Sequence, residues 1–304
     1  MEEGVQRWAV NISNWKPSSH HFLAAMSVLP GHEHSSITRF VKLEDRIRAL
    51  VSRLLQYALV HKVLGIPVHE IIIRRTPEGK PFLVSDNMKL RFKNFNYNVS
   101  HHGDYAAIAS EPICLVGLDI VSHYIPVTES ACEFINSFLP YFSSSEWCHI
   151  FKASSSDEML KVFYKYWCLK EAFVKAIGSG VGYKLDSVEF HHENWDNISV
   201  KIGGKELQDW KFWLLELGPN HSHVRQILYK IWWFASPWQG RLDQGSRFSS
   251  LSRLALSRGG VRRSPSRLEV KGRIEARRRR KLPPLLLVRG SPASPLVVKI
   301  KGCG

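Results

Sequence analysis

A carboxylate and an ammonium group lie on one face of a helix predicted over residues 157–178. In the sequence WCLKEAFVKAIG, Trp167, Glu171 and Lys175 are spaced at i, i+4 and i+8, which puts them on one side of an amphipathic helix. Glu171 and Lys175 could form an ordinary ion pair that stabilises the helix by only ~0.2–0.5 kcal/mol. Alternatively, both groups could act on a bound ligand.

A second carboxylate, that of Asp119, interrupts an apolar stretch that we expect to form a buried strand near residues 114–121. Burial of a lone carboxylate is costly unless it has a partner, although a single aspartate after a strand could also cap a turn or a helix. A hard divalent cation held by Asp119 and Glu171, with Lys175 one helical turn beyond, would suit a phosphorylated ligand. The three residues together predict a metal and phosphate site.

Residues 95–110 have the pattern of a β-hairpin with a polar tip. The predicted turn, residues 100–104, contains a Gly-Asp pair. Asn98, Ser100 and His101 would then lie where backbone amides and short polar side chains converge. Such a turn can bind an anion, or its polar side chains can simply be hydrated.

A basic turn follows the β-branched residues 71–73. The sequence RRTPEGKP, residues 74–81, has two arginines and a lysine around a Pro/Gly turn. Arginine offers a planar fork and lysine a point charge, which is the composition of a phosphate clamp. A solvated basic loop has the same composition and is the alternative.

Taken in order, the four motifs RRTPEGKP, NVSHHGDYAAIASE, VGLDI and WCLKEAFVKAIGSGVG resemble the signature of the 4'-phosphopantetheinyl transferases. The resemblance extends from about residue 7 to about residue 223, and it is greatest to the large, two-lobed eukaryotic type. It implies an α+β fold of two similar lobes related by a pseudo-twofold axis, with the active site in the cleft between them. Four motifs in order are far more specific than any one of them.

The resemblance also implies a reaction. Acting as a holo-[acyl-carrier-protein] synthase, such an enzyme transfers 4'-phosphopantetheine from coenzyme A to a serine of an apo acyl or peptidyl carrier protein and releases adenosine 3',5'-bisphosphate. Asp119 and Glu171 would bind Mg²⁺, Lys175 would contact the coenzyme phosphates, and Glu171 would be the general base, with Lys175 assisting the leaving group. The coenzyme-binding residues would also include two segments: Arg75, Thr76, Pro77, Glu78, Gly79 and Lys80, and Asn98, Val99, Ser100 and His101.

Two positions depart from the family pattern. Many bacterial members have a second acidic residue two positions after the metal-binding aspartate, where this chain has Val121. The larger eukaryotic members also have an apolar residue there and use water as the remaining ligand. A basic residue expected to reach the 3'-phosphate of the coenzyme aligns near Ser36, and Arg39 is the candidate substitute.

The net charge of +15 comes from the end of the chain. Residues 225–304 carry 19 Lys/Arg and 3 Asp/Glu, whereas residues 1–224 have a net charge of −1. The basic segment lacks sustained periodicity, so we expect it to be mostly disordered. Nucleic-acid binding through this tail is a hypothesis of a different class, although the basic residues lack interleaved aromatics. A third hypothesis is a catalytically impaired variant that loses stability, since the family's final strand, expected after residues 221–224, is not found.

The chain divides into an N-terminal α+β lobe over residues 1–112, a C-terminal α+β lobe with the metal site over 113–224, and a basic, atypical tail over 225–304. In the first lobe we expect a strand from residue 7, a major helix from Leu43 to Leu64, and strands near 70–75, 81–84, 94–100 and 105–110. In the second we expect helices near 129–139, 144–151 and 157–178 and strands near 114–121, 186–190, 197–202 and 210–216.

Composition argues against several classes of protein. No apolar run approaches the ~20 residues needed to cross a bilayer, and the acidic amino terminus lacks the apolar core of a secretory signal. Five cysteines without C-x-x-C spacing favour reduced thiols over disulfides or zinc ligands. We therefore expect a cytosolic protein without a membrane or nucleic-acid partner. The family resemblance further implies a monomeric enzyme whose partners are coenzyme A and apo acyl carrier proteins.

Overall fold

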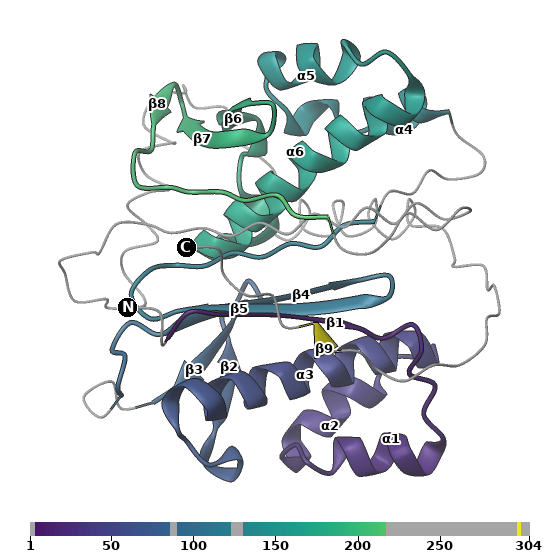
Figure 1. Ribbon diagram of the computed structural model, residues 1–304, viewed down its shortest axis with the longest axis vertical. Helices are drawn as coiled ribbons and strands as arrows, with labels where there is room; N and C mark the ends of the chain where they lie inside the picture. Colours follow the sequence, from purple (N-terminus) through teal and green to yellow (C-terminus); the bar gives the residue numbers. More distant parts are fainter. Residues whose placement is uncertain (1–3, 86–89, 123–129, 217–296, 299–304) are drawn as a thin grey trace, which may run out of the picture.

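The structure is a computed structural model that describes residues 4–85, 90–122, 130–216 and 297–298. It has an N-terminal half, residues 4–111, and a C-terminal half, residues 130–216, each with helices and a β-sheet (Figure 1). The prediction of a protein with mixed helices and sheets is confirmed. The pseudo-twofold relationship and the cleft stay predictions, and the predicted disorder of the tail falls almost wholly outside the described residues. None of the described helices has both the length and the apolar character needed to span a membrane.

The N-terminal half is an antiparallel sheet with helices packed below it in the view of Figure 1. The strand order in this sheet is β4-β5-β1-β9, and β2 and β3 form a separate hairpin. The elements are β1 (Gln6–Asn11), α1 (Ser19–Met26), α2 (Gly31–Thr38), α3 (Leu43–Leu64), η2 (Val68–Glu70), β2 (Ile72–Arg75), β3 (Pro81–Val84), β4 (Asn96–His102), β5 (Tyr105–Glu111) and β9 (Val297–Val298). The two residues of β9 pair with Val10 and Ala9 of β1, so the tail contributes a short strand that the sequence analysis did not predict.

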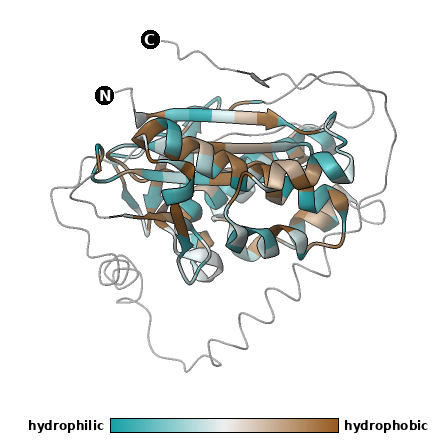
Figure 2. Ribbon diagram, turned by 90° about the horizontal axis from the view of Figure 1, so that it is seen from below, coloured by the Kyte–Doolittle hydropathy of each residue, from teal (hydrophilic) through white to brown (hydrophobic). Residues whose placement is uncertain are grey.

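The longest helix of this half, α3, has the predicted bounds. Its apolar residues recur at helical spacing, and Leu50, Leu59 and Val60 are fully buried in the core beneath the sheet. Gly65 ends the helix in the left-handed conformation, with a φ of 73° that glycine adopts without steric cost. Figure 2 shows hydrophobic and hydrophilic residues alternating along the helices of this half, as amphipathic helices require.

The β4–β5 hairpin has a shorter turn than predicted. The two strands continue until only residues 103–104 separate them, and the first of these, a glycine, has a φ of 53° as a tight hairpin turn requires. Ser100 and His101, which we expected in the turn, lie in β4 and pair with Ala107 and Ala106. Their side chains therefore project to opposite faces of the sheet.

The two faces of the central strand β5 have different packing partners. Ala106 and Ile108 belong to the core that contains α3. The opposite face is built from small strand residues, Ala9, Ala107 and Ala109. It packs against three apolar residues of the connection between the halves, Val116, Leu118 and Ile120. Because the strand residues on this face are alanines, another stretch of chain can lie directly on the sheet.

Residues 116–120, here called the Asp119 segment, lie on this alanine face and do not form a strand, so the strand predicted near 114–121 is wrong. Their backbone amides donate to side-chain oxygens of β4 instead of to a main-chain ladder: Val116 to Asn96 Oδ1 at 3.2 Å, Leu118 to Asn98 Oδ1 at 2.9 Å, and Ile120 to Ser100 Oγ at 3.2 Å. Donors and acceptors both recur with a period of two, as in a strand pair. The alternating pattern of the Asp119 segment therefore resembles that of a strand, but its partners are side chains of β4 and not the backbone of a neighbouring strand.

The C-terminal half is built around α6, which crosses the upper part of the molecule in Figure 1. Ser155 caps its first turn by accepting from the Glu158 amide, and Gly178 ends it with a φ of 70°. The elements are α4 (Ala131–Asn136), η3 (Leu139–Tyr141), α5 (Ser144–Phe151), α6 (Ser156–Ile177), η4 (Gly180–Gly182), η5 (Leu185–Ser187), β6 (Val188–Glu193), β7 (Asp196–Ile202) and β8 (Lys205–Glu206).

The sheet of the C-terminal half has the order β6-β7-β8. The strand predicted near 210–216 is not formed, although its apolar residues are anchored. Phe212 is 6 % exposed and its ring packs edge-on against Phe190 of β6, with the centroids 5.0 Å apart. Packing of single side chains therefore holds this segment without strand pairing.

Glu146 of α5 and Lys170 of α6 form an ion pair that is completely buried. The two charged groups are 2.8 Å apart, the Lys170 ammonium also donates to the carbonyl oxygens of Leu185 and Val188, and Glu146 accepts from the Phe190 amide at 3.0 Å. Burial raises the pKa of Glu146 and lowers that of Lys170, while their mutual attraction opposes both shifts. The pair joins α5, α6 and β6, and the sequence pattern did not indicate it.

Candidate functional site

Asp119, Ser100 and Lys175 meet where the Asp119 segment passes between β4 and α6. The Lys175 ammonium lies 2.5 Å from Asp119 Oδ1 and 3.0 Å from Ser100 Oγ, and the Ser100 hydroxyl lies 3.3 Å from the same carboxylate oxygen. Asp119 is 7 % exposed, whereas the Lys175 side chain is 31 % exposed. The buried carboxylate is therefore balanced by a cation that still reaches solvent.

The helix α6 directs three polar side chains at this point. Cys168, Glu171 and Lys175 are spaced at i, i+3 and i+7, so they share one face. The Cys168 thiol donates to the backbone carbonyl of Asp119 at 3.6 Å. The ion pair of Lys175 is with Asp119, so the simple helical pair with Glu171 does not account for its position.

Gly117 allows the Asp119 segment to lie this close to α6. A Cβ atom at this position would lie 2.0 Å from the backbone carbonyl oxygen of Ala172 and 2.7 Å from the side chain of Ala176. Ala172 and Ala176 both belong to the buried core of the C-terminal half. The glycine of the VGLDI motif is thus required by close packing, and the alanines of α6 are its complement.

The charges at the site keep Lys175 protonated. Burial alone would lower the pKa of Lys175, but the nearby carboxylates of Asp119 and Glu171 outweigh this effect and hold that pKa above its ordinary value. Burial, and next the carboxylate of Asp119, raise the pKa of the Cys168 thiol well above its usual range. Lys175 is therefore a permanent cation at neutral pH, and Cys168 is not a nucleophile.

Asp119 and Glu171 are the residues that could hold a divalent cation. Within the described ranges, no cluster of three or more His, Cys, Asp or Glu side chains suits a metal ion. Magnesium does not need such a cluster, because it is commonly bound by one or two carboxylates together with water and phosphate oxygens. Both carboxylates raise the pKa of the same Lys175 ammonium group, so both lie near it, and oxygen donors of this kind suit a hard, partly hydrated cation.

The predicted coenzyme-binding turn, residues 75–80, is stabilised by its own hydrogen bonds and touches the end of α6. Arg75 donates to the carbonyl of Gly79 at 2.9 Å, and the Lys80 amide donates to Thr76 Oγ1 at 3.2 Å. A Cβ atom at Gly180 would lie 2.9 Å from the Cβ of Glu78. The turn of the N-terminal half therefore lies against the segment that follows α6.

Lys80 links the two halves directly. Its ammonium donates to the carbonyl oxygen of Ala176 at 2.6 Å and to Asn96 Oδ1 at 3.4 Å. Burial lowers the pKa of Lys80 to about 7. Among the predicted site residues, Lys80 is thus a cation whose charge changes near neutral pH.

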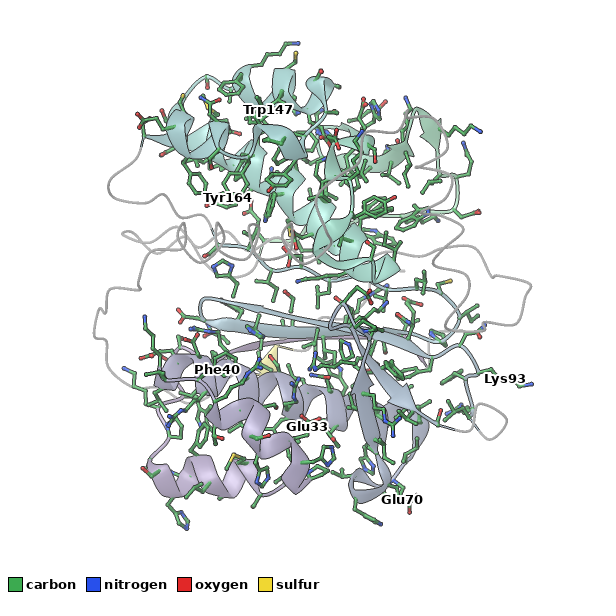
Figure 3. All side chains as sticks on the ribbon, turned by 180° about the vertical axis from the view of Figure 1, so that it is seen from behind. Glu33, Phe40, Glu70, Lys93, Trp147 and Tyr164 are labelled. Atoms are coloured by element: carbon green, nitrogen blue, oxygen red, sulfur yellow. The ribbon has the colours of Figure 1, made fainter. Side chains whose placement is uncertain are left out.

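A further basic cluster surrounds Glu33 of α2, which Figure 3 labels among the helices of the N-terminal half. Arg53 Nε lies 2.7 Å from the Glu33 carboxylate and 3.4 Å from Ser36 Oγ. Burial, and then the neighbouring guanidinium groups of Arg53 and Arg39, lower the pKa of Arg75, while Glu33 opposes these effects. Arg53 therefore pairs with Glu33, and Arg39, Arg53 and Glu33 all act on the Arg75 guanidinium group, so positive charge exceeds negative charge in this region. The sequence analysis missed Arg53, because it lies within α3 and outside every motif.

Two predicted side chains have their contacts elsewhere. The Nδ1 atom of His101 lies 2.9 Å from Ser52 Oγ of α3, on the face of β4 opposite Ser100. Trp167, the first residue of the predicted stripe, packs edge-on against Phe138 with ring centroids 5.1 Å apart. The tryptophan therefore belongs to the aromatic core of the C-terminal half, whereas Glu171 and Lys175 lie nearer the Asp119 segment.

Comparisons with known proteins identify the family of this chain. The family described as "4'-phosphopantetheinyl transferase, N-terminal" matches residues 13–113, and the "4'-phosphopantetheinyl transferase superfamily" matches residues 115–227. The chain is 35% identical over 227 residues to the L-aminoadipate-semialdehyde dehydrogenase-phosphopantetheinyl transferase of Mus musculus, covering 72% of this chain and 73% of the relative. It is 37% identical over 238 residues to the protein of the same name from Xenopus laevis, covering 75% and 77%. A phosphopantetheinyl transferase from Thraustochytrium is 31% identical over 223 residues, covering 71% and 76%. The chain belongs to the 4'-phosphopantetheinyl transferase superfamily.

Proposed function

We propose that Asp119, Glu171 and Lys175 form the catalytic centre of a transferase that moves 4'-phosphopantetheine from coenzyme A to a serine of a carrier protein. Members of the superfamily catalyse this transfer, and this chain is a transferase of that kind. The observation that carries the assignment of residues is the contact of the Lys175 ammonium with the buried Asp119 carboxylate. This contact brings together the VGLDI motif, which contains Asp119, and the WCLKEAFVKAIGSGVG motif, which contains Lys175.

Asp119 and Glu171 would hold Mg²⁺, which when bound neutralises charge on the pyrophosphate. The chain's own cation, Lys175, would contact the same phosphates, because its side chain keeps 31 % exposure and lies beside both carboxylates. Charge neutralisation and positioning are the main demands of phosphoryl transfer. The arrangement of two carboxylates and one ammonium meets both demands.

In the reaction, the serine oxygen of the carrier forms a bond to the phosphorus that bears pantetheine. The pyrophosphate P–O bond breaks, and adenosine 3',5'-bisphosphate leaves. Glu171 would accept the serine proton, directly or through water, since Asp119 Oδ1 already accepts from Lys175 and Ser100 and the carboxylate is assigned to the cation. Lys175 would stabilise the leaving oxygen.

The coenzyme would lie along two edges of the N-terminal half. The first edge is the turn at residues 75–80, where Arg75 and Lys80 supply positive charge. The second is the end of β4, where Ser100 borders Asp119 and His101 follows it. Arg39 and Arg53, which lie near Arg75, would bind the 3'-phosphate in place of the basic residue expected at Ser36.

Several carrier proteins are compatible with this chemistry. Within this range we propose an acyl carrier protein as one substrate. The relatives from Mus musculus and Xenopus laevis bear the name of L-aminoadipate-semialdehyde dehydrogenase, which makes a carrier domain of such an enzyme a second substrate to test. Nucleic-acid binding is not favoured, because the matched families end at residue 227 and the basic excess lies beyond residue 224.

The test is direct. The protein is incubated with coenzyme A, Mg²⁺ and an apo carrier protein, and intact-protein mass spectrometry measures the carrier. We expect the carrier to gain the mass of phosphopantetheine, and a carrier whose acceptor serine is replaced by alanine to gain none. A full-length, folded protein that modifies neither an acyl carrier protein nor a carrier domain of an L-aminoadipate-semialdehyde dehydrogenase would contradict the proposal.

A further inference from the structure

The backbone on either side of Asp119 is held by side chains of the neighbouring strand. Three residues of β4, here called the acceptor row, bond the amides of the Asp119 segment: Asn96, Asn98 and Ser100. The acceptor row projects from the same face of β4 as the alanines that line β5, because Asn98 pairs with Ala109 and Ser100 with Ala107. The segment that carries the candidate metal ligand therefore depends on side-chain acceptors for its position.

Ser100 acts on the Asp119 side chain itself. Its hydroxyl donates to Asp119 Oδ1 and accepts from the Ile120 amide and from the Lys175 ammonium. These bonds use the one donor and the two lone pairs of a hydroxyl group. Ser100 thus belongs to the site directly.

Asn98 acts on the backbone next to Asp119. It is 3 % exposed, and its Oδ1 accepts from the Leu118 amide at 2.9 Å, the shortest of the three bonds of the acceptor row. Leu118 is itself fully buried between the sheet and α6. If the acceptor were lost, the buried Leu118 amide would have no partner in the described contacts, and the chain would have to shift to find one.

A shift of this segment would move the Asp119 carboxylate relative to α6. Gly117 already lies in close contact with the Ala172 carbonyl, so the segment has no room to move toward the helix. Movement would therefore take Asp119 away from Glu171 and Lys175. Displacements of this kind alter the geometry on which catalysis depends without altering any group that contacts the substrate.

We propose that Asn98 is a positioning residue, which fixes the Asp119 carboxylate opposite α6 through the Leu118 amide and does not act by contact with coenzyme A. This inference rests on the proposed function and deepens it. It assigns to Asn98 an effect on metal affinity and turnover, whereas a coenzyme contact would give an effect on the KM for coenzyme A.

The experiment compares Asn98→Leu, which removes the acceptor at similar volume, with Asn98→Ser, which keeps a neutral acceptor oxygen of the kind that Ser100 supplies on the same face of β4. Asn96→Leu is the comparison variant for the Mg²⁺ requirement, because it removes the equivalent bond to Val116, farther from Asp119. It also removes a contact of Lys80, so its KM for coenzyme A is not part of the comparison. For each full-length variant, the measurements are the Mg²⁺ concentration for half-maximal rate, kcat, the KM for coenzyme A, and hydrogen exchange at the Leu118 amide.

For Asn98→Leu we expect kcat to fall about tenfold, the equivalent of one buried hydrogen bond, and the half-saturating Mg²⁺ concentration to rise. The KM for coenzyme A should change little. Asn98→Ser should recover part of the loss, and Asn96→Leu should shift the Mg²⁺ requirement less. A folded Asn98→Leu protein with wild-type kcat and Mg²⁺ requirement, or one changed only in KM, would overturn the inference.

Hydrogen exchange separates this inference from the proposed function. If the wild-type protein modifies no carrier, the proposed function fails, yet the Leu118 amide can still be measured. Faster exchange at Leu118 in Asn98→Leu than in Asn98→Ser supports the positioning role. Equal exchange in wild type and Asn98→Leu overturns it whatever the activity.

Discussion

The side chains of Lys175 and Asp119 are 56 positions apart in the sequence and 2.5 Å apart in space. Lys175 belongs to the last turns of α6, and Asp119 to a segment that lies on the sheet of the N-terminal half. Their contact therefore forms only when that segment is packed between the sheet and α6. The site depends on the junction of the halves as much as on the residues that do the chemistry.

Replacement of Lys175 by Met should lower the rate of carrier modification well beyond tenfold, because the cation beside both carboxylates is lost. Lys175→Arg keeps the charge and should retain more activity. The matched control is Lys184→Met, since Lys184 is an exposed lysine whose carboxylate partner is 3.7 Å away. Steady-state kinetics of carrier modification are measured for the three variants. Unchanged kinetics in Lys175→Met would show that this lysine only stabilises the helix.

Replacement of Gly117 by Ala should destabilise the protein by ~1–3 kcal/mol, as overpacking of a filled core does. The added methyl group would meet the carbonyl oxygen of Ala172. Activity should fall together with stability, because the Asp119 segment must move. Gly31→Ala is the control, since a Cβ atom there meets no atom within 4 Å. Urea unfolding compares the two, and equal stability would contradict the packing described at Gly117.

Sequence patterns predicted the elements whose side chains have a clear period. The bounds of α3 were predicted correctly, and α6 begins and ends within one residue of its prediction, because apolar residues recur at helical spacing and a glycine follows each helix. The Asp119 segment shows why pattern alone fails elsewhere. A period of two identifies an extended chain, but it does not reveal that side chains of Asn98 and Ser100 replace the neighbouring strand as acceptors.

For the candidate site too, the sequence predicted some residues and missed others. The motifs indicated which residue types carry charge, and they named Asp119, Glu171 and Lys175. They did not indicate Arg53, whose approach to Glu33 depends on how α2 packs against α3. The buried pair of Glu146 and Lys170 likewise has no local signal, because its partners come from different helices and its hydrogen bonds from a third element.

Replacement of Lys170 by Met should destabilise the C-terminal half by ~3–5 kcal/mol, because Glu146 would be left as an uncompensated buried charge. The double variant Lys170→Met with Glu146→Gln removes both charges and should recover part of this loss. Chemical denaturation of the single and double variants gives the free energies of unfolding. A single variant as stable as wild type would contradict the burial of this pair.

Affinity for coenzyme A should fall as the pH rises through about 7. Burial lowers the pKa of Lys80 to about 7, so its ammonium is charged below that pH and neutral above it. Phosphate groups bind the charged form, and affinity is therefore greatest on the acid side. Isothermal titration between pH 6 and pH 8.5 measures the change, with buffers of matched ionic strength.

Lys80→Arg is the control for this pH dependence, because a guanidinium group stays charged over the whole range. The variant should bind coenzyme A with little dependence on pH above 7. An equal loss of affinity in wild type and Lys80→Arg would assign the titration to another group and contradict the role given to Lys80.

The central claim is that Asp119 works in catalysis, and the rate of carrier modification by Asp119→Asn tests it most directly. Mass spectrometry follows phosphopantetheine transfer from coenzyme A with Mg²⁺, circular dichroism verifies folding, and Asp186→Asn, at an exposed carboxylate near the end of α6, is the control. We predict that Asp119→Asn is folded and slower by roughly 10²–10⁴-fold, because the charge that holds the cation and Lys175 is lost, while Asp186→Asn keeps the wild-type rate. A folded Asp119→Asn protein that modifies the carrier at half the wild-type rate or faster would contradict the account.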